Sequence, residues 1–300
     1  MPRRIAVTGG TGFIGRHLVD ALLTQGDQVL IVSRSMPKIV QPGAEIITWA
    51  QLESGDSRLE GLDAIVNLAG ESINQRWTPS AKARILDSRM KTTDSIARLV
   101  ERLERKPRVV INGSGMSIYG TSETVHYDES SPVRLTDFLA GVVEQWEHAA
   151  QRISGTRLVL LRIGIVLGAD GGALPPMLLP YRLFAGGRVG SGRQWMSWIH
   201  IEDIIRLTDF CIECEEIEGP VNATAPHPVR NNEFGRMIAK TTGRPHWFPV
   251  PSFLFKLLFG ELSVLLLEGQ HVLPRKPLEL GFEFRYPTLE TALRQLLSRS

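Results

Sequence analysis

The sequence has few cysteines and no long uninterrupted apolar run. Its two cysteines, Cys211 and Cys214, form a single C-x-x-C without a second pair, which is poor support for a zinc site. We expect two half-buried thiols in a reducing compartment and no bound metal. The most apolar window, residues 253–267, is broken by a lysine, a glycine and a glutamate, and it is shorter than the roughly 20 residues that a spanning helix needs. We therefore expect buried helices or a subunit contact there, and no membrane partner.

The chain also lacks a strong charge of either sign. Its 34 Lys and Arg residues against 32 Asp and Glu residues give a formal net charge of +2, too weak a field to indicate a nucleic-acid partner. Arg3 and Arg4 precede an apolar run, but Thr8, Gly9 and Gly10 interrupt that run before a signal-peptide core can form. We expect a cytoplasmic globular protein, and 300 residues allow one large domain and a smaller one.

A glycine-rich turn is the strongest local signal. Residues 8–15 read TGGTGFIG directly after the apolar run 5–7, and an amphipathic helix pattern follows. Gly9 or Gly10 can take the tight-turn backbone, Gly12 lets the main chain approach phosphates, and Gly15 lets the helix pack near the strand. The start of that helix then points its N–H groups at an anion. The residues expected around a dinucleotide pyrophosphate are Gly9, Gly10, Thr11, Gly12, Phe13, Ile14 and Gly15.

The first half alternates strand and helix patterns, which predicts an α/β fold with a doubly wound parallel sheet. The expected strands are 5–8, 29–33, 45–49, 64–68, 109–113 and 158–163. The expected helices are 12–24, 79–104, 136–154, one from about residue 202, and 289–297. Thr78 is a plausible N-cap for the second of these, with Pro79 in its first turn.

After residue 168, loops rich in glycine and proline break this rhythm. We expect a second, smaller region there. The predicted division assigns 1–165 plus 190–214 to a dinucleotide-binding Rossmann-type domain. It assigns 166–189 plus 215–300 to a smaller domain on the substrate side.

The end of the second strand reports on cofactor choice. Ser33 and Arg34 stand where a carboxylate would bind the free 2′-hydroxyl of NAD. A hydroxyl and a guanidinium suit a 2′-phosphate instead, so NADP(H) is the expected cofactor. The alternative is a solvent-exposed arginine in a polar loop.

Small residues follow the fourth strand and would let the adenosine half of a cofactor lie against it. The expected contacts are Leu68, Ala69, Gly70 and Glu71. Taken alone, this segment is an ordinary exit from a strand.

Four segments, in order, resemble the extended short-chain dehydrogenase/reductases, which include nucleotide-sugar epimerases. They are GGTGFIG (9–15), DAIVNLAG (63–70), SGMSIYG (114–120) and WIHIED (198–203). A closer resemblance is to an atypical epimerase-like subfamily with a short distinctive C-terminal domain. It is carried by AGESINQRW (69–77), LDSRMKTT (86–93), GSGRQWMSWIHIED (190–203) and EGQHVLPRKPLELGFEF (268–284). The resemblance implies an NADP-binding Rossmann domain and establishes no substrate.

The resemblance also transfers individual cofactor contacts. Arg89, four residues before Thr93, occupies the place where the extended family has an asparagine that touches the cofactor. Arg89 and Arg76 are therefore candidate partners for phosphate or ribose, although single arginines are more often solvated cations. Val166 matches the family segment that passes the nicotinamide, and we expect a main-chain contact there.

The family's catalytic pair is missing. Its reaction uses a tyrosine whose pKa is lowered by a lysine four residues later, together with a serine. Aligned on Glu147, the sequence has Leu139 and Val143 at those two positions, and a shift of one residue gives Phe138 and Val142 instead. Ser114 and Tyr119 are the candidate catalytic residues that remain, although Ser114 could cap a turn and Tyr119 could simply pack at the strand end.

The loop 190–198 combines glycines, a guanidinium and two indoles, and it could clamp a planar or phosphorylated ligand. Candidate substrate contacts are Arg193, Trp198 and His200. His200 could also supply a proton, although a histidine among apolar residues is more often structural. Asp203 could orient His200, and we favour a cap on the following helix.

Two functions remain open at this stage. One is an NADP-dependent, epimerase-like oxidoreductase acting on a small polar substrate, for which a sugar is one candidate. The other is a regulatory or scaffold protein that binds NADPH without catalysis, motivated by the missing Tyr/Lys pair, with 253–267 as its partner surface. A homodimer fits either function.

Overall fold

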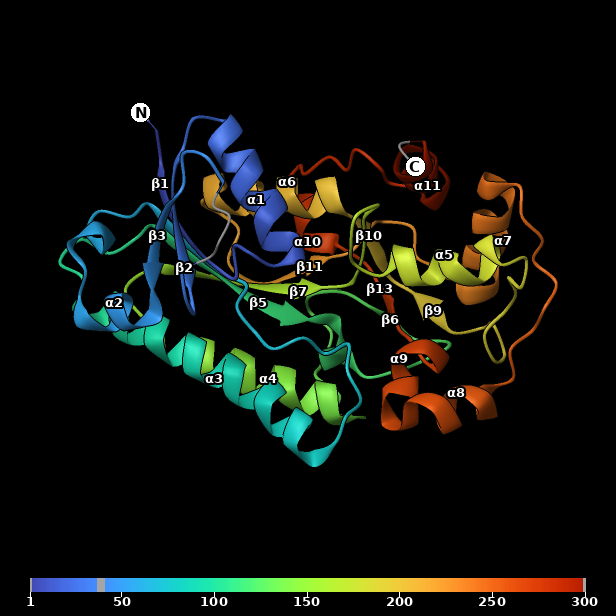
Figure 1. Cartoon of the computed structure of the whole chain (residues 1–300). Coiled ribbons are helices and arrows are strands. Elements are labelled where there is room, and N and C mark those ends of the chain that lie inside the picture. Colours follow the sequence, from blue (N-terminus) through green and yellow to red (C-terminus); the bar gives the residue numbers. More distant parts are fainter. Residues whose placement is uncertain (1, 37–40, 299–300) are drawn as a thin grey trace.

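A seven-stranded parallel sheet organises the chain, of which the computed structural model describes residues 2–36 and 41–298. Its strand order, β11-β7-β5-β4-β1-β2-β3, is doubly wound, which confirms the predicted Rossmann-type fold (Figure 1). The strands are β1 (Arg4–Thr8), β2 (Gln28–Ser33), β3 (Glu45–Thr48), β4 (Ala64–Asn67), β5 (Val109–Gly115), β7 (Arg157–Ile163) and β11 (Gly219–Ala223).

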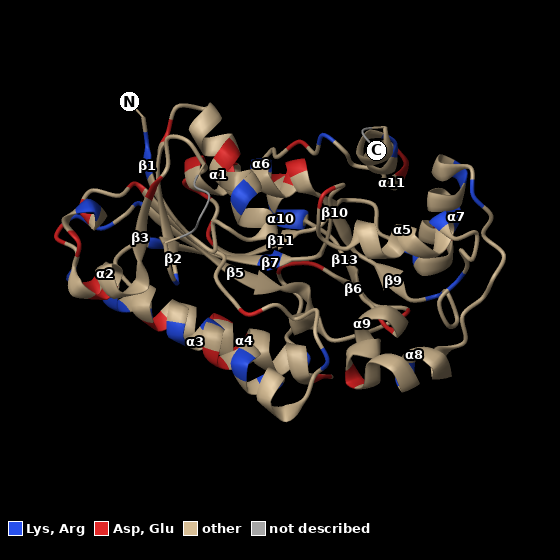
Figure 2. Cartoon of the chain, viewed as in Figure 1, with Lys and Arg blue, Asp and Glu red and all other residues tan. Residues whose placement is uncertain are grey.

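Helices cover both faces of this sheet (Figure 1). On one side α1 (Phe13–Thr24) and α6 (Ile201–Glu213) pack against each other and bury Leu18 and Ile204. On the other side lie α3 (Pro79–Arg102) and α4 (Phe138–Ala150), and Ile96 of α3 is buried there. Full burial of one such side chain is worth about 1.5–3 kcal/mol, so these stripes fix the layers. Figure 2 shows Lys and Arg interspersed with Asp and Glu along α3, as suits a helix with one solvated side.

Local side-chain caps explain where several elements begin. The Thr78 hydroxyl accepts the Ala81 N–H at the start of α3, which confirms the predicted cap. The third strand ends at Thr48, one residue earlier than predicted, because Thr48 and Gln51 form a capping box for α2 (Trp49–Ser54). The sequence reading missed both α2 and the edge strand β11. β11 joins the main sheet, although its residues were assigned to the smaller domain.

Short elements build the region beyond the sheet. The helices are α5 (Leu174–Arg182), α7 (Asn231–Thr242), α8 (Ser252–Phe259), α9 (Val264–Leu267), α10 (Arg275–Glu279) and α11 (Leu289–Leu297). The strand pairs are β8 (Ile165–Leu167) with β10 (Trp198–His200), β9 (Trp195–Met196) with β12 (Val229–Arg230), and β6 (His126–Tyr127) with β13 (His271–Val272). The 3-10 turns are η1 (Ser57–Leu59), η2 (Met116–Tyr119) and η3 (Gly260–Ser263).

The most apolar segment of the chain is not buried as a whole. None of the residues of α8 is buried, and Leu257 is 74% exposed. The expectation of buried helices over 253–267 is therefore wrong for the single chain, because hydropathy alone does not tell which face an apolar helix presents. Among the described residues, no helix is both long and apolar enough to cross a membrane.

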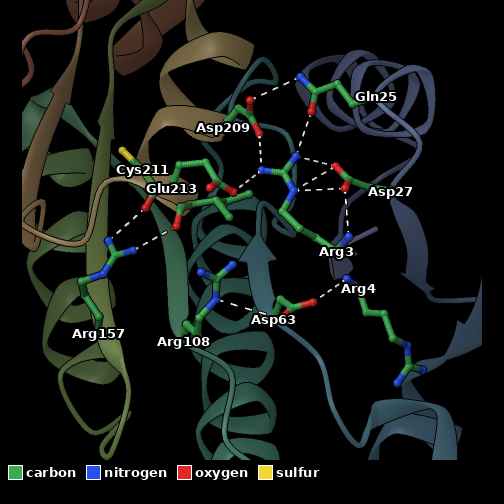
Figure 3. Close-up of polar contacts among 11 residues, drawn as sticks. Arg3, Arg4, Gln25, Asp27, Asp63, Arg108, Arg157, Asp209, Cys211 and Glu213 are labelled. Atoms are coloured by element: carbon green, nitrogen blue, oxygen red, sulfur yellow. Dashed lines mark hydrogen bonds and ion pairs between the residues drawn. The ribbon is translucent and has the colours of Figure 1, made fainter. Parts of the chain in front are cut away.

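An ionic cluster fastens the amino-terminal edge of the sheet to α1 and α6 (Figure 3). Arg3 pairs with Asp27 at the start of β2, with Asp209 at 2.9 Å and with Glu213 at 2.6 Å. Nearby, Arg157 donates to the carbonyl oxygens of residues 211, 212 and 217 at 2.6–3.1 Å. These contacts satisfy carbonyl groups at and beyond the end of α6, where a helix leaves its acceptors unpaired. Cys211 is buried and Cys214 is half-buried, both as free thiols.

The residue that caps α6 is His200, so the prediction of Asp203 as the cap is wrong. His200 Nδ1 accepts the Glu202 N–H at 3.0 Å. Asp203 is fully buried and accepts the N–H groups of Arg285 and Tyr286 at 2.8 and 2.9 Å. One carboxylate thereby ties the segment before α11 to the sheet domain.

We predict that Asp203→Ala lowers the free energy of unfolding by about 2–3 kcal/mol, because two N–H groups lose a charged acceptor. Urea denaturation measures this value. Glu215→Ala, at an exposed position just past α6, serves as the control and should change stability by less than about 0.5 kcal/mol. Equal stability of the two variants would contradict this role for Asp203.

Candidate dinucleotide site and the cleft beside it

The glycine turn between β1 and α1 requires glycine at defined places. Gly9 has φ of 69°, and a Cβ there would lie 2.8 Å from the main chain of Leu68. A Cβ on Gly15 would collide with the carbonyl oxygen of Gly9. The turn therefore depends on Gly9, and Gly15 allows α1 to start directly against it.

The start of α1 is open to an anion. Gly12 is its N-cap and offers no side chain, so the N–H groups of the first turn, at Phe13, Ile14 and Gly15, have no capping side chain among the described residues. Together with the positive end of the helix dipole, these N–H groups have the geometry that suits an anion. The Phe13 ring lies where a Cβ on Gly168 or Gly172 would stand, so this site adjoins the loop after β8.

The residues expected to bind the rest of a dinucleotide lie along the same edge of the sheet. Ser33 is half-buried at the end of β2, and Arg34 is exposed immediately after it. Leu68 and Ala69 are half-buried beyond β4. Parallel strands end at one edge, so β1, β2 and β4 bring these positions together.

Arg89 and Arg76 differ in their surroundings. Arg76 is exposed, whereas the Arg89 guanidinium donates to the carbonyl oxygens of Glu71 and Ile85 at 3.1 and 3.0 Å. It also lies 5.0 Å from the centre of the Trp146 ring. Burial lowers the pKa of Arg89 to about 10, which leaves it charged at neutral pH. Among the described residues it has no ion pair, and its guanidinium lies beside Gly70.

A chain of buried polar side chains supports this edge, and the sequence reading missed it. The Thr8 hydroxyl donates to Asn67 at 2.6 Å, and the Asn67 amide donates to Asn112 at 2.7 Å. The Trp146 indole donates to Thr93 at 2.9 Å, which contacts both asparagines. Asn67 and Asn112 are register partners on β4 and β5. An asparagine in each of these two strand segments was the feature of the sequence from which the hydrogen bond between them could have been predicted.

The positions of the missing catalytic pair are filled by packing. Leu139 and Val143 are buried on α4, and Val143 lies 3.2 Å from where a Cβ on Gly115 would stand. Neither side chain can donate or accept a proton. The structure thus has apolar, buried side chains at both positions, in agreement with the sequence.

Ser114 and Tyr119 belong to a buried hydrogen-bond network. The Ser114 hydroxyl donates to Glu147 at 2.5 Å, and Arg162 forms a two-pronged ion pair with the same carboxylate at 2.8 Å. Arg162 also donates to the Tyr119 hydroxyl at 2.8 Å, which in turn donates to Asn222 at 2.7 Å. Glu147 and Arg162 had no place in the sequence-based site.

The protonation states of this network follow from burial and pairing. Burial raises the pKa of Tyr119 to about 12 even with Arg162 beside it. Burial alone would lower the pKa of Arg162, but its hydrogen bonds to Glu147 more than offset this and raise it. At neutral pH Tyr119 is therefore a protonated phenol. The tyrosine of the wider family has the opposite shift, a lowered pKa.

The network continues into the C-terminal region through Asn222 on β11. The Asn222 side chain donates to the Leu273 carbonyl oxygen at 2.9 Å. Glu129 accepts the main-chain N–H groups of Asn222 and Lys276 at 2.9 and 3.1 Å. Burial raises the pKa of Glu129. The sheet, the connection before α4 and the C-terminal region thus meet at this one strand.

Two of the three predicted substrate contacts lie inside the core. Trp198 and His200 have no exposed surface, and their ring nitrogens bond to His227 and to Gln295 and Glu202, respectively. Arg193 is exposed and pairs with Glu123 at 3.2 Å. The loop that carries Arg193 reaches solvent through its first residues, Gly190 and Ser191.

A cleft of about 670 Å³ opens beside that loop. It lies between the starts of α3 and α4 and the segment from α8 to α9. Two aromatic rings, Trp77 and Phe138, stand 5.3 Å apart on one wall. Lys256, Glu261 and Ser191 contribute polar groups. Phe138, on the wall of the cleft, directly precedes Leu139 in the sequence. No group of three or more potential metal ligands occurs in residues 2–36 or 41–298.

Comparison with known proteins assigns the chain to a family. Residues 5–223 match the NAD dependent epimerase/dehydratase family, and residues 250–296 match a domain of unknown function, DUF1731. The chain belongs to the NAD dependent epimerase/dehydratase family. The first match ends with β11, so the family segment includes the whole seven-stranded sheet, and the second covers α8 to α11.

Full-length relatives occur in bacteria and animals. The chain is 43% identical over 297 residues to the epimerase family protein YfhF of Bacillus subtilis, covering 98% of each chain. It is 40% identical to the mouse epimerase family protein SDR39U1, over 98% of this chain and 100% of that one. The crystal structure of human epimerase family protein SDR39U1 with NADPH superposes with a TM-score of 0.92 at 39% identity, over 99% and 100% of the two chains.

More distant structures share the fold alone. UDP-glucose 4-epimerase of Thermotoga maritima, solved with UDP-glucose, superposes with a TM-score of 0.78 at 19% identity, over 98% of this chain and 97% of that one. The family match and the relatives at 39–43% identity confirm the resemblance to extended short-chain dehydrogenase/reductases and to their epimerase-like subfamily.

We predict that Glu147→Ala lowers the free energy of unfolding by about 3–5 kcal/mol, because it leaves the buried Arg162 cation without a partner. The double variant Glu147→Met with Arg162→Met should recover most of this loss, since it removes both charges. Urea denaturation measures all three proteins. Asp94→Ala, which breaks an exposed pair with Arg152, is the control and should cost less than about 1 kcal/mol. A double variant no more stable than Glu147→Ala would refute the unpaired-charge argument.

Proposed function

We propose that this protein binds NADP(H) and is an epimerase-like oxidoreductase of the extended short-chain dehydrogenase/reductase type. The uncapped start of α1 against the Gly9 turn carries the proposal, because it is built for a pyrophosphate. NADPH in the related human SDR39U1 structure supports it. The predicted cytoplasmic location and homodimer stay predictions.

We propose that Arg34 binds the 2′-phosphate of NADP(H). It is exposed at the end of β2, where an adenosine ribose would lie in this fold. A guanidinium binds a phosphate with two parallel hydrogen bonds, while a free ribose hydroxyl offers it much less. Ser33, half-buried beside it, supplies a hydroxyl. Arg89, a half-buried cation with no ion pair among the described residues, and Arg76 are the proposed further contacts to ribose or phosphate. Val166 is the proposed main-chain neighbour of the nicotinamide.

We propose the 670 Å³ cleft as the substrate site. Its two aromatic rings provide an apolar wall, and its serine, lysine and carboxylate groups suit a small polar substrate such as a sugar. Arg193 remains a proposed contact because its loop borders the cleft. Trp198 and His200 have no exposed surface, so we propose that they hold that loop in place rather than touch substrate.

The catalytic residues Ser114 and Tyr119 stay a prediction. Tyr119 is a protonated phenol, so it could donate a proton to a carbonyl oxygen as a hydride arrives from the cofactor. Its hydroxyl is buried between Arg162 and Asn222, so this role needs substrate to reach a closed network.

The apolar positions Leu139 and Val143 favour a second candidate function. We propose as the alternative a regulatory or scaffold protein that binds NADPH and has lost the proton-transfer pair. The same cofactor site serves both functions, so cofactor binding alone does not separate them. Turnover does.

We predict that Arg34→Asp raises the Kd for NADPH roughly 10- to 100-fold, because a charged hydrogen bond to phosphate is lost and a repulsion is added. The Kd for NADH should change less than about threefold. Isothermal titration calorimetry measures both. Arg294→Asp on α11, equally a surface arginine replaced by a carboxylate, is the control. Equal losses for the two cofactors would remove Arg34 from the 2′-phosphate site.

We predict that the protein oxidises NADPH anaerobically with at least one member of a panel of carbonyl compounds and keto sugars. Tyr119→Phe or Ser114→Ala should lower that rate about 100-fold or more if they act in proton transfer. Tyr127→Phe is the matched control, because Tyr127 is stacked on Tyr119 and equally buried. Silence across the panel with NADPH demonstrably bound would favour the non-catalytic alternative.

A further inference from the structure

Two segments of the chain contain no acidic residue. Residues 171–201 hold three arginines and residues 234–260 hold four cations, with no Asp or Glu in either. The whole chain has 34 basic and 32 acidic residues, so the rest of it carries 27 against 32, a formal charge of −5. The seven cations are Arg182, Arg188, Arg193, Arg236, Lys240, Arg244 and Lys256. The modest net charge of the protein therefore conceals an uneven distribution, because these two segments are basic and the rest of the chain is acidic.

Residues 174–193 of the first segment and residues 234–260 pack into one outer lobe on the side of the molecule that carries α5, α7 and α8 (Figure 1). The main-chain N–H groups of Trp247 and Phe248 donate to the Gly186 carbonyl oxygen at 2.9 and 3.0 Å. Val250 donates to Arg188 at 2.9 Å. The Arg244 guanidinium lies 4.3 Å from the centre of the Phe184 ring, so the cations of one segment stand beside the aromatic residues of the other.

This outer lobe also exposes large apolar side chains. Of the fifteen large hydrophobic residues that the described chain exposes, nine lie in these two segments. They are Leu179, Leu183, Phe184, Trp247, Phe248, Phe253, Leu257, Leu258 and Phe259. Trp247 is 70% exposed and Leu257 is 74% exposed, so these groups are not the margins of a core. A cluster of this kind marks an interaction surface.

We propose that the outer lobe docks on an anionic lipid surface. Exposed Trp, Phe and Leu side chains with Lys and Arg between them are the combination that enters the interface of a bilayer, where the apolar groups reach the acyl boundary and the cations meet lipid phosphates. The connection from α7 to α8 contains no Asp or Glu, and Arg244 is its one charged residue (Figure 2). Nothing in this docking requires a spanning helix.

Charge favours lipid over a second copy of the chain. A symmetric dimer through the outer lobe would place the same cations opposite each other without one carboxylate from these segments. Only Arg193 and Lys240 have ion pairs in the described residues, with Glu123 and Glu290 outside the two segments. Anionic headgroups supply the missing counter-charge. The proposal does not rest on the proposed cofactor or reaction, although Lys256 lines the proposed substrate cleft and Arg193 is a proposed substrate contact. It replaces the expectation that the protein has no membrane partner.

Cosedimentation of the full chain with vesicles tests the proposal. We expect binding to vesicles of phosphatidylglycerol and phosphatidylcholine, and weak binding to phosphatidylcholine alone. Leu257→Ser with Leu258→Ser should reduce the partition coefficient about tenfold or more, since two apolar groups no longer enter the interface. Arg182→Glu with Arg244→Glu should do the same at low salt, and less at high salt.

Matched controls remove comparable groups elsewhere. Leu135→Ser with Leu278→Ser removes two leucines that are 52% and 46% exposed outside the outer lobe. Arg98→Glu with Arg108→Glu reverses two surface arginines whose side chains are 60% and 50% exposed. Both controls should bind vesicles within about twofold of the parent protein, because neither pair lies in the lobe. Calorimetric NADPH binding by every variant reports the cofactor site separately, so a failure here is distinguishable from a failure of the proposed function.

The proposal is overturned if the parent protein does not bind phosphatidylglycerol vesicles at low salt, or if the control variants lose as much binding as the lobe variants. It is equally overturned if light scattering shows a dimer that Leu257→Ser with Leu258→Ser dissociates while vesicles do not compete for it. The lobe would then be a contact between copies. Vesicle binding that dissociates such a dimer would support the lipid surface.

Discussion

The buried pair of Glu147 and Arg162 is the constraint around which the candidate site is arranged. One carboxylate holds α4 to β7, and its partner cation continues to Tyr119 on η2. Because each charge is tolerable in the core only through the other, neither α4 nor β7 can shift alone. The hydroxyl of Ser114 is bound to the same carboxylate. The candidate catalytic residues Ser114 and Tyr119 thus have a structural role, and any chemistry at them must preserve these hydrogen bonds.

The fold and the cofactor edge were largely predictable because they depend on local patterns. The Gly9 turn, the strand periodicities and the Thr78 cap all lie within a few residues of the features that they determine. Arg162 and Glu147 form a site only after α4 and β7 pack, and no spacing rule announces such a pair. The apolar α8 shows another limit, because composition reveals that a helix is apolar but not which neighbours cover it. His200 caps α6 in place of Asp203, because the Asp203 carboxylate accepts the main-chain N–H groups of Arg285 and Tyr286 instead.

Two kinds of surface follow from this arrangement. The carboxyl edge of the sheet is fixed by hydrogen bonds among Thr8, Asn67 and Asn112, whose side chains are buried. The two segments of the outer lobe are joined by main-chain contacts at Gly186 and Arg188, and nine of their large apolar side chains are exposed. Rigid support suits the recognition of one small molecule in one geometry. An exposed apolar and cationic surface suits a partner defined by its average chemistry rather than its shape.

Glu129 has a consequence for how the sheet ends. β11 is an edge strand, and edge strands offer free N–H groups to any extended chain that meets them. At Asn222 that N–H is already taken by the Glu129 carboxylate, whose second oxygen holds Lys276 of α10. An incoming strand would have to displace this half-buried carboxyl acceptor before pairing. Glu129 therefore protects the protein against edge-to-edge aggregation at the strand where its two matched segments meet.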